Sequence, residues 1–238
     1  MAGHSKWANI KRRKEKVDAK KGKIFSRVAK EIITAVKQGG SGDPKGNPRL
    51  KAAIDRAKEV NFPQENIERN IKKATSADQG EYFDLTYEIY GHGGVGIVVE
   101  ILTDNKNRTS SDMRIATNKR GGTVATPGSV LFQFDRKGVI RIPQSTISED
   151  ELFMIALECG VDEIESSEEE WILFTRVDDL LEVKKALAEK GCKIAEAEFE
   201  QIPKNFVEVD EENRKKNDDL IEWIENLEDV DAVFTNMA

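Results

Sequence analysis

Apolar residues between positions 24 and 77 recur at every third or fourth position, the spacing of amphipathic helices. The first stripe ends at Gly39-Gly40, a helix-stopping pair. Asn47-Pro48 then marks a second helix start, with Asn as the N-cap and Pro at the first helical position. Pro63 opens a third helix. The pattern therefore predicts a three-helix unit. The residues of the first stripe are Ile24, Phe25, Val28, Ile32, Ile33 and Val36.

The apolar period then changes from 3.6 to 2, which is the period of strands. Phe83, Leu85, Tyr87 and Ile89 alternate with polar residues. A second, nearly all-apolar strand follows at residues 95–102, after the turn sequence GHGG. Asp104-Asn105 caps a helix that runs to about Arg120, and SVLFQF at 129–134 predicts a third strand.

From Lys137 the order is strand, helix, strand, strand, helix, strand, ending near Phe199, which is the ferredoxin-like pattern. A strand at 206–209, a helix at 210–227 and a strand at 230–235 follow, without partner strands of their own. The region 82–134 is short of strands, so we expect the two segments to combine. The fold class is predicted as α+β, with a three-helix domain (1–79), a discontinuous α/β domain (80–135 plus 204–238) and an inserted ferredoxin-like domain (136–203).

Charge is distributed very unevenly along the chain. The protein has 37 Lys and Arg against 44 Asp and Glu, a net charge of −7. Residues 1–78 nevertheless carry 20 basic and 9 acidic side chains, whereas residues 142–238 carry 9 and 28. A polyanion would therefore be attracted by the N-terminal part and repelled by the C-terminal part.

The most basic stretch is residues 1–27, where ten Lys and Arg face two acids, and its first 20 residues lack an apolar stripe. Such an arm neutralises phosphates, and Trp7 can stack on a base. Alternatives are an acidic protein, a membrane surface or a solvated helix face, although a solvated face usually mixes in acids. The predicted nucleic-acid-binding residues here are Lys6, Trp7, Lys11, Arg12, Arg13, Lys14, Lys20, Lys21 and Lys23.

A second basic group follows the predicted strand that ends at Leu102. A helix N-terminus attracts anions, and the helix from Asn105 to Arg120 adds cations around it. A solvated crossover helix is the alternative interpretation. The predicted phosphate-contacting residues are Lys106, Arg108, Arg114, Lys119 and Arg120.

Little in the chain points to catalysis. GHGGVG at 91–96 matches the dinucleotide fingerprint G-x-G-x-x-G, but a strand rather than a helix follows it, so we interpret it as a hairpin turn. The two His residues lie in predicted loops, and Cys159 and Cys192 have no metal or disulfide spacing. We expect no catalytic residues, metal, cofactor or small-molecule substrate, and no membrane partner. The oligomeric state stays open.

Several segments together resemble the YebC/PmpR family. They are MAGHSKWANIK at the start, KKGKIFS (20–26), GGSGDPKGNPRL (39–50), NIERNIKKAT (66–75), YEIYGHGGVGIVVE (87–100), LTDNKNRT (102–109) and TPGSV (126–130). The likeness continues more loosely to the end of the chain. Arg12-Arg13 and His92 depart from the family's usual residues without removing a charge or a glycine.

The resemblance implies three domains, a cytoplasmic location and no known enzymatic activity. Members are usually described as probable DNA-binding transcriptional regulators, and others act as translational activators at the ribosome. We therefore predict a DNA-binding regulator, with a ribosome- or RNA-associated translation factor as the alternative. A protein-interaction module that uses the acidic C-terminal half is a third hypothesis.

Overall fold

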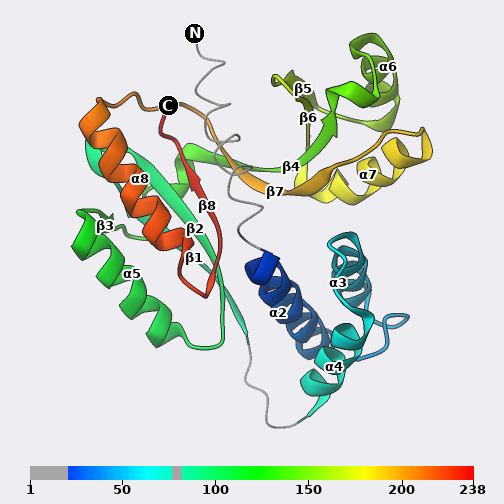
Figure 1. Ribbon diagram of the computed structural model, residues 1–238, viewed down its shortest axis with the longest axis horizontal. Coiled ribbons are helices and arrows are strands. Elements are labelled where there is room, and N and C mark those ends of the chain that lie inside the picture. The colour runs from blue at the N-terminus through cyan, green and yellow to red at the C-terminus, as the bar shows by residue number, and fades with distance from the viewer. Residues whose placement is uncertain (1–20, 77–81) are drawn as a thin grey trace. The chain divides into compact units, whose positions relative to one another are not determined.

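The computed structural model describes residues 21–76 and 82–238 (Figure 1). The chain forms two compact units. The first combines the part of the chain up to Val130 with Val207–Ala238, and the second is Leu131–Phe206. The basic arm predicted at residues 1–20 lies outside the described residues.

Three helices open the described part of the first unit: α2 (Lys21–Gly39), α3 (Pro48–Glu59) and α4 (Gln64–Thr75). The apolar stripe of α2 packs against both other helices, with Ile32 and Leu50 fully buried. Asn47 is the N-cap of α3, since its Oδ1 accepts from the Leu50 amide at 3.0 Å. Its Nδ2 donates to the Ala35 carbonyl at 2.8 Å, which ties the loop to α2. The predicted helices and the Asn-Pro cap are confirmed.

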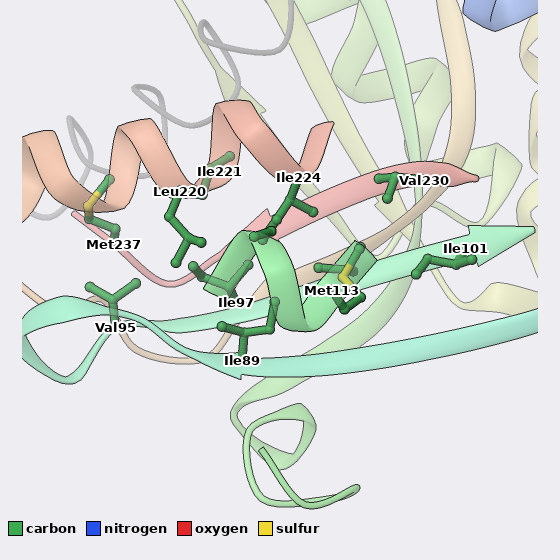
Figure 2. Close-up of a cluster of buried hydrophobic side chains, with 12 residues drawn as sticks. Ile89, Val95, Ile97, Ile101, Met113, Leu220, Ile221, Ile224, Val230 and Met237 are labelled. Atoms are coloured by element: carbon green, nitrogen blue, oxygen red, sulfur yellow. The ribbon is translucent and has the colours of Figure 1, made fainter. Parts of the chain in front are cut away.

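The first unit also contains a four-stranded antiparallel sheet in the order β3-β1-β2-β8. Its strands are β1 (Phe83–Tyr90), β2 (Gly96–Thr103), β3 (Thr123–Val124) and β8 (Val230–Thr235). Helices α5 (Lys106–Arg120) and α8 (Glu211–Glu225) pack against each other. Figure 2 shows the core that they share with the sheet, where Ile89, Ile97, Met113 and Leu220 converge. Burial of these apolar side chains is the main force that holds β8 against strands more than a hundred residues earlier in the chain.

The second unit is a ferredoxin-like fold. Its elements are β4 (Phe134–Pro143), α6 (Glu149–Cys159), β5 (Glu163–Ser166), β6 (Glu170–Thr175), α7 (Leu180–Glu189) and β7 (Glu196–Pro203). The strands form an antiparallel sheet in the order β5-β6-β4-β7, which is that of the split β-α-β motif. The inner faces of α6 and α7, with Leu152 and Leu187 fully buried, pack on Ile140 and Leu173. The predicted fold class is confirmed.

Two predicted strands are wrong. In place of a strand at 129–134, the chain makes a turn and a short 3-10 helix (Leu131–Gln133) before β4 begins. The carboxylate of buried Glu88 accepts from the amides of Gly128 and Val130, so a side chain, not a neighbouring strand, satisfies the Val130 amide. The place beside β1 belongs to β3 instead.

The strand predicted at 206–209 is a single parallel bridge between Val207 and Met237. The last strand of the second unit is also displaced, because it runs from Glu196 to Pro203 rather than ending at Phe199. Among the described residues, no helix has the length and apolar character needed to cross a membrane.

Candidate nucleic-acid interface

Helix α5 carries the second group of predicted site residues, and both of its ends are capped as the sequence indicates. The Oδ1 of Asn105 accepts from the amides of Asn107 and Arg108 at 3.1 and 3.0 Å. At the other end Gly121 adopts the left-handed conformation, with φ at 79°. Thr109, Met113, Ala116 and Thr117 form the buried face. The remaining positions are left for solvent or a ligand.

Arg108 does not point freely into solvent, because an acidic side chain far along the chain holds its guanidinium. Its Nη2 lies 2.8 Å from both carboxylate oxygens of Asp229, and its Nε donates to Oδ2 at 3.1 Å. Asp104 accepts from the same Nη2 at 2.8 Å. A doubly held guanidinium has few donors left for a phosphate.

Asp229 is the centre of a larger buried network. Its oxygens also accept from the hydroxyls of Thr103 and Thr109 and from Nζ of Lys30 on α2. Burial by itself raises the pKa of Asp229, but the hydrogen bonds from Arg108, Lys30 and Thr103 outweigh it and hold the pKa below its ordinary value. The network therefore joins α2, the end of β2, the start of α5 and the turn before β8.

Arg114 and Lys119 are the cations of α5 that remain open to a ligand. Both are exposed, and neither forms an ion pair with any residue that the structure describes. A separation of five residues places them about 140° apart around the helix. They flank the exposed face from two sides instead of forming one line.

Lys106 and Arg120, at the two ends of α5, each lie over an aromatic ring. The Nζ of Lys106 is 3.9 Å from the centre of the Phe83 ring, and the guanidinium carbon of Arg120 is 5.0 Å from that of Trp223. Arg120 also lines a shallow hollow on α8 together with Asp219 and Glu222. The two carboxylates make this hollow unfavourable for a phosphate.

The glycine-rich loop at 91–96 has a structural role. Asn217 of α8 clamps it, because its Oδ1 accepts from the His92 amide at 2.7 Å and its Nδ2 donates to the His92 carbonyl at 3.0 Å. Gly93 has φ at 69°, and a Cβ there would lie 2.8 Å from Val209. His92 in turn donates from Nε2 to the Arg120 carbonyl at 2.8 Å. The interpretation as a hairpin turn is confirmed by the pairing of β1 with β2.

The first group of predicted site residues lies mostly outside the described part of the chain. Lys6, Trp7, Lys11, Arg12, Arg13, Lys14 and Lys20 all belong to residues 1–20. Lys21 and Lys23 lie in the first turn of α2. Whether these residues bind nucleic acid stays a prediction.

A further set of cations, which was not predicted from the sequence, lies on the three-helix part of the first unit. Each of them is exposed and makes no ion pair with a described residue. We call them the helical cations: Lys45 in the loop before α3, Lys51 and Lys58 on α3, and Arg69, Lys72 and Lys73 on α4. Lys51 and Lys58 are seven residues apart, so they lie on one side of α3. That spacing was visible in the sequence and could have identified the pair.

Cations of the second unit behave differently. Most of them pair with nearby carboxylates, as in Lys137 with Glu163, Arg176 with Asp179 and Lys190 with Glu158. Buried Arg141 lies 2.6 Å from a Glu200 oxygen. Unneutralised positive charge is therefore concentrated on the three-helix part of the first unit.

Comparison with known proteins agrees with this architecture. Residues 5–77 match the model of the TACO1/YebC protein N-terminal domain, and residues 82–237 match that of the TACO1/YebC second and third domain. The chain belongs to the TACO1/YebC family. The resemblance predicted from the sequence motifs is therefore confirmed.

Relatives in the TACO1/YebC family match along the whole chain. A probable transcriptional regulatory protein of Protochlamydia amoebophila is 60% identical over 100% of this chain and 96% of its own length. One of Chlamydia trachomatis serovar L2 is 55% identical, with 100% of both chains covered. The crystal structure of a conserved hypothetical protein from Aquifex aeolicus has a TM-score of 0.84 and 40% identity, covering 94% of this chain and 93% of that one.

Proposed function

We propose that the protein is a nucleic-acid-binding regulatory factor that contacts DNA phosphates and regulates transcription. The observation that carries the proposal is the separation of charge: the helical cations lack carboxylate partners among the described residues, while most cations of the second unit have them. The names of the relatives, probable transcriptional regulatory proteins, support the same role.

The binding surface would combine three groups of residues. The basic arm at residues 1–20 supplies the highest density of charge. The helical cations and the pair Arg114 and Lys119 extend it. Since such contacts release counterions, affinity should fall steeply with salt. The sequence shows no helix-turn-helix pattern with a polar recognition face. We therefore expect contacts to the DNA phosphate backbone, rather than to base edges, to dominate.

A charge-reversal pair tests this surface directly. We expect Lys51→Glu/Lys58→Glu to bind a 30-base-pair DNA duplex about tenfold more weakly at 100 mM salt, and to reduce the slope of log affinity against log salt by about two. Fluorescence anisotropy between 50 and 200 mM salt measures both quantities. Removal of residues 1–20 should weaken binding further while the thermal unfolding midpoint stays unchanged.

The matched control is Lys185→Glu/Lys193→Glu in the second unit, where two exposed lysines change charge by the same amount. It should bind DNA nearly as tightly as the unaltered protein. Equal losses in both variants would mean that net charge alone matters, and an unchanged affinity of Lys51→Glu/Lys58→Glu would remove α3 from the interface.

The alternative, a ribosome-associated translation factor, needs a different measurement. Sucrose-gradient sedimentation of a lysate with and without RNase separates the two. Migration free of ribosomes, together with enrichment at promoters, is expected for a transcriptional regulator. Co-migration that RNase abolishes would instead identify RNA as the partner. In this proposal the protein is a regulator without catalytic activity, and it works in the cytoplasm.

A further inference from the structure

Helix α6 in the second unit exposes three large apolar side chains next to one another. Phe153, Met154 and Leu157 are 51%, 65% and 80% exposed. Their positions i, i+1 and i+4 lie within about 100° around the helix. Single exposed apolar residues are ordinary, but a cluster on one helix face usually marks an interaction surface.

Packing within the unit does not account for these residues. The core contacts of α6 are made by Leu152 and Ala156, which are 0% and 1% exposed, with partly buried Ile155 and Cys159 packed against the same core. These four positions already supply the apolar face that a two-layer fold needs. Helix α6 therefore has a second apolar face that points away from its own core.

All the charged side chains of α6 are acidic. The helix has no Lys or Arg, and Glu149, Asp150, Glu151 and Glu158 are all exposed. Only Glu158 has a basic partner on the described part of the chain, Lys190 at 2.6 Å. Across Leu131–Phe206, 18 acidic residues face 9 basic ones. A nucleic acid or an anionic lipid would be repelled here.

We propose that the α6 face (Phe153, Met154 and Leu157 with their acidic surround) is a docking surface for a basic amphipathic helix of a protein partner. Apolar side chains of the partner would pack on the three residues, spaced as in other helix-to-helix recognition. Lys or Arg residues flanking that stripe would face Glu149, Asp150 and Glu151. The protein would thus join a nucleic acid, through its basic part, to a basic protein through its acidic part.

The test uses three fluorescent synthetic peptides and the full-length protein. The first is an 18-residue amphipathic helix of Leu and Lys, the second has Glu in place of Lys, and the third is a scramble of the first without a continuous stripe. Fluorescence anisotropy should show the Leu-Lys helix binding at least about tenfold more tightly than either of the others. In Phe153→Gln/Met154→Gln/Leu157→Gln this affinity should fall about tenfold.

Two controls keep the result specific. Ile115→Gln removes an exposed apolar residue from a helix of the other unit and should leave peptide binding unchanged. Leu157→Gln alone, at the most exposed of the three positions, should weaken binding in a protein with an unaltered thermal unfolding midpoint and unaltered DNA affinity.

Several outcomes would overturn the proposal. Equal binding of the Leu-Lys and Leu-Glu helices would show that charge plays no part, and full affinity in the triple variant would place the peptide elsewhere. Sedimentation velocity in which the triple substitution converts a dimer into a monomer would assign the face to a second copy of the chain. Flotation with phosphatidylcholine vesicles that depends on the three residues would assign it to lipid.

Discussion

The guanidinium of Arg108 and the carboxylate of Asp229 meet in a bidentate ion pair across 121 residues of chain. Asp229 is 5% exposed at its side chain and Arg108 is 42% exposed, so one partner is buried and the other reaches it from the surface. A pair of this kind contributes to stability mainly because loss of either partner leaves the other uncompensated. Arg108 therefore has a structural role, whether or not it also contacts a phosphate.

The first prediction separates Arg108 from its neighbour on the same helix. Arg108→Gln should lower the free energy of unfolding by about 2 kcal/mol, less than for a fully buried pair because Lys30 and two hydroxyls still hold Asp229. Arg114→Gln, an exposed residue without an ion pair among the described residues, should change it by less than about 0.5 kcal/mol. Urea unfolding measures both. DNA affinity that falls for Arg114→Gln would support its place in the interface.

A second prediction concerns the pH dependence of the same network. The folded-state pKa of Asp229 lies below the ordinary 3.8, so its contribution to stability is present above that pH and is lost as the pH falls through the folded pKa. Asp229→Asn should cost about 2 kcal/mol at pH 7 and progressively less at pH values below 3.8. Urea unfolding at pH 7 and pH 3 tests this. A cost that is the same at both pH values would contradict it.

Asp231, two residues later, should have the opposite pH dependence. Burial raises its pKa to about 6; Glu31 and Glu100 act in the same direction, while Arg27, which forms an ion pair with it at 3.2 Å, and Arg56 act against it. Stability from this group is present below pH 3.8 and is lost as the pH rises through 6. Asp231→Asn should raise the free energy of unfolding at pH 7.5 by on the order of 2 kcal/mol. It should have little effect at pH 4, which the same unfolding series would show.

The fourth prediction tests the structural interpretation of the glycine-rich loop. Asn217→Ala removes both hydrogen bonds to the His92 backbone and should lower the free energy of unfolding by about 2 kcal/mol. Gly93→Ala should also destabilise the protein, because φ is positive and the new Cβ meets Val209. Isothermal titration with NAD should show no binding to the unaltered protein. Binding that Gly93→Ala abolishes would restore the dinucleotide interpretation.

The helices and most strands were predictable because their apolar periods are strong and local. The three helices of the N-terminal part each have a clear stripe and a Pro or Gly boundary. The segment at 129–134 is different, since its apolar residues favour a strand that the chain does not form. In the structure, Glu88 accepts from the amide of Val130 in this segment and from that of Gly128 just before it, and a local pattern contains no information about a carboxylate forty residues away.

The candidate site divides in the same way. The sequence by itself determined where along the chain charge of each sign lies, because charge follows from the residue type at each position. It could not distinguish Arg108 from Arg114, which have the same charge and lie on the same predicted helix. Only the tertiary structure decided that, because pairing of β8 with β2 brings the turn at Asp229 to the start of α5. Burial of that carboxylate then requires a cation, and Arg108 lies within reach while Arg114 lies nearly two turns further along the helix.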